Sequence, residues 1–386
     1  MPAAAACPNP MNGLSPLLDL DACRVRQARL RNCMAERSLD AVVLVAPEHV
    51  QYFTGHRWDF RFAPAVALLL TGETLLVCPD KPLEREQVAA TEVRTYVAKR
   101  RSTLRTDQRE ASSAVLGDWL AARGRQARVG VEFSVCPPHV TRLLAGAEVL
   151  DVDLDLLALR RRKDPDELVL LRRAIAATGA MYEAARQRIR PGVSELEIFS
   201  ALQAAAVETC GEMLTGTGND YACGVRGGPP RTRPCDAGEL YILDLGPAYR
   251  GYFGDNARTI AVDGRPTDDQ LAAWRHVCEA LAVVERRARP GVRCRDIYEE
   301  VRQWLATAPV GSWSSHLGHG IGLFVHEMPH LNPEWDDVLE AGDVIAVEPA
   351  LYDPALRCGM RIENNYLVTD AGLELLSPFP LDLALA

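Results

Sequence analysis

The chain has 386 residues, which is enough for two domains and a large apolar core. Hydrophobic residues make up 48% and charged residues 25%, as in an ordinary globular protein. The formal net charge of −9 argues against general nucleic-acid binding, because phosphate contacts need a basic face. No apolar run approaches the ~20 residues that span a bilayer, so we expect no membrane segment.

The cysteines indicate a reducing compartment. There are 11 of them, scattered, and no CxxC pair occurs. This pattern predicts free thiols in a cytoplasmic protein rather than a disulfide framework or structural zinc. Residues 1–17 lack the basic start and apolar core of a signal peptide, and their Ala, Pro and Gly content predicts a flexible tail.

A first domain is predicted over residues 18–152. Short apolar runs typical of buried strands lie at residues 41–45, 65–70, 74–78 and 128–131. Helical stretches at residues 22–36 and 108–122 lie between them. Strands that alternate with helices predict an α/β layer, and no catalytic group stands out in it.

The second domain, expected over residues 160–386, contains an internal duplication. The motif RPGV occurs at residues 190–193 and 289–292, and each copy opens a helix with the same apolar spacing. An earlier helix precedes each copy, one capped by Asp164 and the other by a Thr267–Gln270 capping box. A strand follows each copy and ends in a carboxylate, Asp244 or Glu348. The repeated order predicts a pseudo-twofold domain.

Two aspartates flank a predicted turn. The strand ILDLG is apolar up to Asp244, a turn follows at residues 249–251, and the chain returns as YFGDNARTIAV with Asp255. An antiparallel hairpin places the two acids on neighbouring strands, where burial is costly without positive charge between them. We interpret the pair as metal ligands, with an Asp that caps the turn as the structural alternative.

Histidines and glutamates supply the other candidates. In GHGIGLFVHEMP, three glycines predict a close approach of backbone to a ligand, and His319 and His326 flank this turn. Glu348 ends one apolar strand and Glu363 lies in another, where an unpaired Glu is out of place. An ion pair with Arg361 is the structural alternative for one glutamate.

Together these residues predict a dinuclear metal site with five ligands: Asp244, Asp255, His319, Glu348 and Glu363. Two cations ~3.5–4 Å apart hold a hydroxide nucleophile and clamp the reacting oxygen. The mainly oxygen ligand set favours two Mn²⁺ ions, with Co²⁺, Fe²⁺ and Zn²⁺ left open.

On these motifs, residues 163–380 resemble the pita-bread metallopeptidases: methionine aminopeptidase, aminopeptidase P, prolidase and creatinase. The first half, with QYFTGHR at residues 51–57, is similar to the creatinase/prolidase N-terminal domain. The resemblance implies an α/β fold in which that domain precedes a pita-bread catalytic domain. It places the family's five metal ligands on the same five residues, in the same order.

The resemblance also implies roles for individual residues. Glu348 would be the general base for the metal-bound water, and His326 would contact the substrate and stabilise the tetrahedral intermediate. Arg361 would support the strand of Glu363 and belong to the substrate-binding set. A homodimer is implied, in which His56 and Arg57 are candidates to border the partner's site.

Two departures from the family pattern bear on the substrate. Peptidase members usually carry a His about where Gly227 lies, but CGVRGGPPRTRP contains arginines instead: Arg226, Arg231 and Arg233. Prolidase-like members often have a His four residues before the ligand His319, a position that Ser315 occupies here, with His316 displaced by one.

The sequence therefore predicts metal-dependent hydrolysis of an amide, the bond before proline in a short peptide, by an Xaa-Pro aminopeptidase or dipeptidase. One alternative keeps the metals and takes a small anionic C–N substrate, such as a modified amino acid or a ring-opened amide. Another is a pita-bread binding protein without catalysis, which the presence of all five ligands disfavours.

Overall fold

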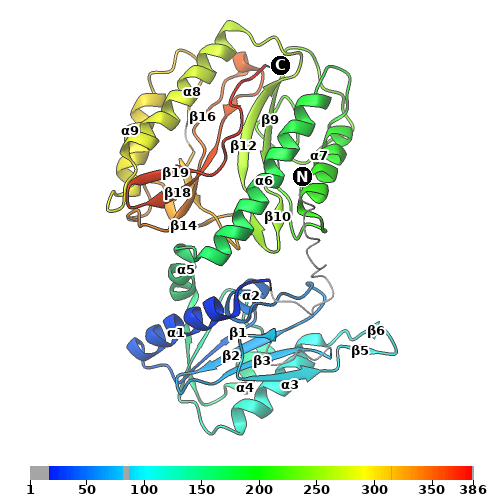
Figure 1. The fold of residues 1–386 in the computed structure, drawn as a ribbon, viewed down its shortest axis with the longest axis vertical. Coiled ribbons are helices and arrows are strands. Elements are labelled where there is room, and N and C mark those ends of the chain that lie inside the picture. The colour runs from blue at the N-terminus through cyan, green and yellow to red at the C-terminus, as the bar shows by residue number, and fades with distance from the viewer. Residues whose placement is uncertain (1–16, 81–86, 219, 314, 385–386) are drawn as a thin grey trace, which may run out of the picture. The chain divides into compact units, whose positions relative to one another are not determined.

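The computed structural model describes residues 17–80, 87–218, 220–313 and 315–384, so the tail expected at residues 1–17 lies almost wholly outside them. The chain divides into two compact units, Met1–Arg160 and Arg161–Ala386, and each is described here by itself (Figure 1). Among the described residues, no helix combines the length and apolarity needed to cross a membrane.

The first unit is built on a six-stranded mixed sheet of order β4-β3-β2-β1-β7-β8. At its centre, β1 pairs antiparallel with β2 and parallel with β7, and every residue of β1 is buried. The strands are β1 Ala41–Leu44, β2 Ala65–Leu69, β3 Thr74–Pro79, β4 Glu92–Tyr96, β7 Arg128–Val131 and β8 Glu148–Asp151, with a small β5–β6 hairpin at Lys99–Arg100 and Thr103–Leu104.

Helices cover this sheet and close its core. Leu116 and Trp119 of α3 pack against the sheet within one apolar cluster, and Asp19 caps α1 by accepting hydrogen bonds from two backbone N–H groups at 2.9 Å. The helices are α1 Leu20–Glu36, α2 Pro47–Thr54, α3 Gln108–Ala121, α4 Pro138–Leu143 and α5 Asp153–Arg161. The predicted strands and both predicted helices are observed, with ends that differ by at most two residues.

The two residues considered for a subunit interface have partners inside this unit. His56 is buried, and its Nε2 lies 2.5 Å from the carbonyl oxygen of Gln87. Arg57 forms an ion pair of 2.6 Å with Glu48. Their role at a partner's site stays a prediction.

In the second unit, strands lie between two helix pairs, α6 with α7 and α8 with α9 (Figure 1). A five-stranded antiparallel sheet of order β14-β13-β15-β18-β19 accompanies the β9–β12 ladder and the short β10–β11 and β16–β17 pairs. The helices are α6 Pro165–Arg188, α7 Glu195–Cys210, α8 Asp268–Arg287 and α9 Cys294–Leu305, with a 3₁₀ turn at Pro354–Leu356. The strands are β9 Leu240–Leu245, β10 Ala248–Tyr249, β11 Tyr252–Phe253, β12 Asn256–Ala261, β13 Gly318–Gly320, β14 Glu327–Leu331, β15 Val344–Val347, β16 Ala350–Leu351, β17 Met360–Arg361, β18 Asn364–Thr369 and β19 Gly372–Leu375.

The repeated order of two helices and a carboxylate strand is present in this unit. In the first copy α6, α7 and β9 follow one another; in the second, β13 and β14 come between α9 and β15. Capping boxes open both leading helices: the Asp164 N–H donates to Glu167 Oε2 at 3.0 Å, and the Thr267 N–H donates to Gln270 Oε1 at 2.9 Å. The α8–α9 pair contributes Val277, Leu281 and Val301 to the main apolar cluster of the unit.

Candidate metal centre

Asp244 and Asp255 lie on the two strands of one hairpin. Asp244 is in β9, opposite Ala257 of β12 in an antiparallel register, and Asp255 directly precedes β12. The short β10–β11 pair, with Tyr249 opposite Tyr252, forms the turn between them. The hairpin expected from the sequence therefore exists and brings both carboxylates to the same end of the ladder.

Three further side chains come from adjacent strands of the five-stranded sheet. His319 is the central residue of β13, which pairs with β15. Glu348 directly follows β15, Glu363 directly precedes β18, and the last residue of β15 is paired with the first residue of β18. The Glu363 N–H donates to the Ala257 carbonyl at 2.9 Å, which joins this sheet to the aspartate hairpin.

These five side chains converge. Carboxylate oxygens of Asp244, Asp255 and Glu363 lie within 4.8 Å of one another. The His319 Nε2 lies 3.6 Å from Asp255 Oδ2 and 3.4 Å from Glu348 Oε1. The two halves of the duplicated unit thus bring all five predicted ligands into one cluster.

Burial and mutual repulsion govern the protonation of this cluster. Burial, helped by neighbouring carboxylates, raises the pKa of Asp255 and of Glu363 well above the usual range. Burial also raises the pKa of Asp244 to about 6, although Arg361 acts against it. Burial opposes the charged form of His319, but Glu348 and Asp255 outweigh it and raise its pKa to about 9. Glu348 differs, because burial acts against its charged form but His319, His316 and Arg361 outweigh it and hold its pKa below the usual value. The raised pKa values of the other four groups indicate a shortage of positive charge, which a divalent cation supplies.

The donor atoms fit such a cation. Among the described residues, the buried Glu363 Oε1 has no hydrogen-bond partner, an uncommon state for a buried carboxylate oxygen. His319 Nδ1 lies 3.0 Å from the Gly320 carbonyl oxygen, which fixes the tautomer that leaves Nε2 free to coordinate. Carboxylate oxygens with one imidazole are a donor set suited to Mn²⁺ and its neighbours in the transition series.

Two of the glycines around His319 lie tightly between neighbouring strands. A Cβ at Gly318 would lie 2.0 Å from the Ala346 carbonyl oxygen of β15, and one at Gly320 would lie 2.0 Å from the Met328 carbonyl oxygen of β14. Gly318 and Gly320 therefore allow a close approach to the flanking strands. The absence of a Cβ at these positions allows β13, which carries His319, to pack closely between β14 and β15.

Arg361 holds one of the aspartates in place. Its Nη1 forms an ion pair with Asp244 and lies 3.2 Å from Asp220 Oδ2, while its Nε donates to the Tyr352 hydroxyl at 3.1 Å. These contacts make Arg361 a positioning group for Asp244; its predicted place in the substrate-binding set remains a prediction. Neither Asp220 nor Tyr352 was identified from the sequence, because no motif marks either residue.

Two more histidines border the cluster. The exposed His326 stacks on His319 with ring centroids 3.8 Å apart. Although part of the residue is exposed, partial desolvation of its ring, together with the charges of His319 and His316, lowers the pKa of His326 to about 4, so its imidazole is neutral near pH 7. His316 Nε2 lies 3.4 Å from Glu348 Oε1. The displacement of His316 by one position therefore still leaves it beside the cluster.

Asp220 explains why no side chain stands at Gly227. A Cβ at Gly227 would lie 2.3 Å from Asp220 Oδ2, and the same carboxylate accepts the Gly228 N–H at 2.8 Å. The space beside Gly227, about where related peptidases carry a His, is filled by the carboxylate that contacts Arg361.

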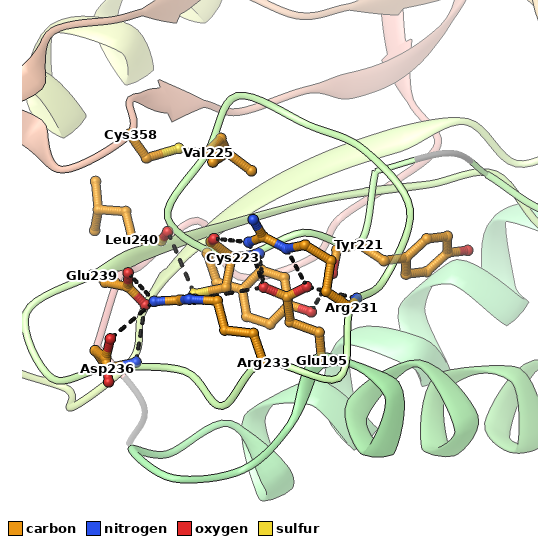
Figure 2. Close-up of polar contacts among 11 residues, drawn as sticks. Glu195, Tyr221, Cys223, Val225, Arg231, Arg233, Asp236, Glu239, Leu240 and Cys358 are labelled. Carbon is orange, nitrogen blue, oxygen red and sulfur yellow. Dashed lines mark hydrogen bonds and ion pairs between the residues drawn. The ribbon is translucent and has the colours of Figure 1, made fainter.

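Two of the three arginines in this loop are bound to carboxylates (Figure 2). Arg231 donates to both oxygens of the fully buried Glu195, at 2.6 and 2.9 Å. Arg233 pairs with Glu239 and lies 3.0 Å from Asp236. Figure 2 shows these groups as one network, so Arg231 and Arg233 stabilise the loop.

The fold and this cluster define the class of protein. Residues 169–370 match the model of metallopeptidase family M24, and residues 26–162 match the creatinase/prolidase N-terminal domain. The chain belongs to metallopeptidase family M24, whose members use divalent metals. It is an α/β protein in which a creatinase-like domain precedes the pita-bread domain.

Relatives with similar sequences carry the same general description. An uncharacterised peptidase of Staphylococcus aureus is 29% identical over 365 residues, which cover 88% of this chain and 95% of that protein. One of Staphylococcus epidermidis is 27% identical over 360 residues, covering 91% of this chain and 98% of that one.

Solved structures share the fold over nearly the whole chain. An Xaa-Pro dipeptidase from Bacillus anthracis superposes with a TM-score of 0.80 at 25% identity, covering 94% of this chain and 99% of that one. The prolidase from Pyrococcus horikoshii superposes with a TM-score of 0.78 at 23% identity, covering 93% and 99% of the two chains, and shows the fold alone.

Proposed function

We propose that this metallopeptidase is a dinuclear-metal enzyme that cleaves the amide bond before proline in short peptides, as an Xaa-Pro aminopeptidase or dipeptidase. The observation that carries the proposal is the convergence of four buried or half-buried carboxylates on the Nε2 side of His319. The similarity to an Xaa-Pro dipeptidase structure supports the peptide class.

The residues that would hold two cations are Asp244, Asp255, His319, Glu348 and Glu363. When bound, divalent cations supply the positive charge that polarises a scissile carbonyl and promotes ionisation of a water nucleophile. The oxygen-rich donor set favours Mn²⁺. Arg361 keeps Asp244 aimed into the cluster through the ion pair between them.

Glu348 and His326 are the proposed catalytic groups. Glu348 lies at the edge of the cluster, with Oε1 3.4 Å from both His316 and His319, where it can accept a proton from water. His326 is exposed beside His319, so its ring N–H can donate to the oxygen of a tetrahedral intermediate.

Two further expectations belong to this proposal. The cysteines in the part of the chain that the structure describes are free thiols, which supports a reducing compartment such as the cytoplasm. A homodimer remains the expected assembly on the basis of the family resemblance.

A panel of Xaa-Pro dipeptides and tripeptides, with Mn²⁺, Co²⁺ or Zn²⁺ added, tests the activity. We expect Glu348→Gln to lower kcat by about 10²–10⁴-fold, because the proton acceptor is lost while the side-chain volume is kept. The matched control is Glu374→Gln at the exposed end of β19, which should keep wild-type kcat. Full activity in Glu348→Gln would rule out its assignment as the base.

A second candidate substrate class is a small anionic C–N compound. The exposed guanidinium of Arg226 near the cluster favours it. N-acyl amino acids in the same panel separate this class from Xaa-Pro peptides.

A further inference from the structure

Arg226 differs from the other two arginines of its loop. Arg231 and Arg233 are each paired with carboxylates, whereas within the described ranges no carboxylate lies at ion-pair distance from Arg226. Its guanidinium instead stacks on the ring of Tyr352, with Cζ 3.7 Å from the ring centroid. The side chain is exposed, so its charge is available to a ligand.

The backbone around Arg226 is fixed against the cluster. The Arg226 carbonyl accepts a hydrogen bond of 3.0 Å from Arg361 Nη2. The preceding Val225 carbonyl accepts from the Cys358 thiol at 2.7 Å (Figure 2), and the Gly228 N–H donates to Asp220 at 2.8 Å. The loop tip is therefore anchored on both sides of Arg226 before any substrate arrives.

Stacking gives the guanidinium a defined orientation near the metal ligands. Tyr352, whose ring lies against Arg226, accepts a hydrogen bond from Arg361, which in turn pairs with Asp244. Two residues, Tyr352 and Arg361, thus connect Arg226 to the predicted ligand Asp244. A stacked guanidinium keeps the N–H groups at its edge free, and these match the two oxygens of a carboxylate.

The negative charge of the cluster bears on what the Arg226 guanidinium can bind. Five carboxylates lie in or against it, because Asp220 adds to the four carboxylate ligands. Two bound divalent cations and Arg361 would only balance these five negative charges, so a further cation is needed to attract a substrate carboxylate. Every unmodified peptide carries a terminal carboxylate, and in a dipeptide this group lies next to the scissile bond.

We propose that Arg226 binds the C-terminal carboxylate of the peptide substrate and selects very short peptides. The inference rests on the proposed Xaa-Pro peptidase function and names the substrate class within it. Each additional residue moves the carboxylate by up to about 3.3–3.6 Å, whereas the stacked guanidinium stays fixed. Dipeptides therefore place the carboxylate at Arg226, and longer peptides lose the contact.

The test compares Ala-Pro with its C-terminal amide in the Mn²⁺-loaded protein. We expect the wild-type protein to prefer Ala-Pro by at least about tenfold in kcat/KM, the value of one charge-assisted contact. Arg226→Gln should lower kcat/KM for Ala-Pro by about 10–100-fold, mainly by raising KM. It should change kcat/KM for the amide by no more than about twofold. For Arg226→Lys, kcat/KM for Ala-Pro should lie between the values of the wild type and Arg226→Gln, because an ammonium keeps the charge but lacks the planar guanidinium fork.

The control and a binding measurement complete the test. Arg265→Gln, an exposed arginine in the turn after the far end of β12, should leave both substrates unaffected. Calorimetry should show that Glu348→Gln binds Ala-Pro more tightly than the Glu348→Gln/Arg226→Gln protein.

The outcomes separate the two hypotheses. If Arg226→Gln lowers turnover of Ala-Pro and of the amide equally, or if the wild type does not distinguish them, the role of Arg226 is overturned and the peptidase stands. If the wild type cleaves neither compound with any of the three metals, the proposed function fails and the role of Arg226 fails with it.

Discussion

Replacement of Arg231 by Met should destabilise the protein, because it leaves a buried carboxylate without its cation. Glu195 is fully buried, and Arg231 donates to both of its oxygens. After the change, Glu195 keeps the backbone N–H groups of residues 223 and 231, at 2.9 and 2.8 Å, and Arg233 at 3.6 Å. Glu195 therefore loses only part of its electrostatic compensation.

The magnitude follows from the exposure of the pair. Breaking a fully buried ion pair costs about 3–5 kcal/mol. The Arg231 side chain is 42% exposed, so solvent screens part of the interaction, and the remaining N–H donors compensate further. We expect the free energy of unfolding to fall by about 1.5–3 kcal/mol at pH 7. For a unit of this size that lowers Tm by roughly 3–10 °C.

Urea denaturation between pH 4 and pH 7.5 measures this effect and its pH dependence. Burial opposes ionisation of Glu195, but the hydrogen bonds and charge of Arg231 outweigh it and hold its pKa below the usual value. A carboxyl with a lowered folded pKa stabilises the protein above the unfolded pKa and loses that contribution as the pH falls through the folded pKa. The difference between wild type and Arg231→Met should therefore shrink toward pH 4.

A double variant provides the control. Adding Glu195→Gln to Arg231→Met removes the uncompensated charge. The double variant should therefore lose less free energy of unfolding than the sum of the losses in the two single variants. A loss below about 0.5 kcal/mol in Arg231→Met, or one that does not depend on pH, would refute the ion-pair reasoning.

Two other predictions concern the metal cluster and its surroundings. Gly227→Ala should lower the free energy of unfolding by about 1–3 kcal/mol and reduce activity, because its Cβ displaces Asp220 from Arg361; wild-type Tm and kcat would contradict this. Mn²⁺ at about 100 times its Kd should stabilise the protein by about 2.7 kcal/mol after chelator treatment, and Asp244→Asn should weaken this effect. Unchanged Tm with Mn²⁺, Co²⁺ and Zn²⁺ would argue against a metal site.

Local patterns were sufficient to predict much of this fold. The buried runs of the first unit and the capped helices of the second show residue by residue in the sequence, and the Asp244–Asp255 hairpin follows from a polar residue at each side of a turn. Asp220 was not predicted, because its contacts with Gly227 and Arg361 form only in the folded chain. Sequence alone likewise could not distinguish the neutralised Arg231 from the available Arg226, since the partner Glu195 lies outside their loop, at the start of α7.

The contacts of the glycines beside His319 were only partly predicted. The sequence indicated a turn whose backbone approaches a ligand, which stays a prediction, but it did not show that Gly318 and Gly320 allow β13 to fit between β14 and β15. The distinction depends on which strands are neighbours in the sheet, and strand order is a property of the tertiary structure that local pattern does not contain.

The predicted ligands come from both copies of the duplicated unit, with the aspartate hairpin in the first copy and the histidine and glutamate strands in the second. During synthesis, the first copy can emerge from the ribosome and fold its hairpin, yet it presents only two carboxylates to any ion. The proposed coordination would be complete only after β17 has been translated and Glu363 has joined β12. Metal capture by this site would therefore be a late event in the maturation of the protein, and a nascent chain that stalls before that point would have little means of retaining an ion.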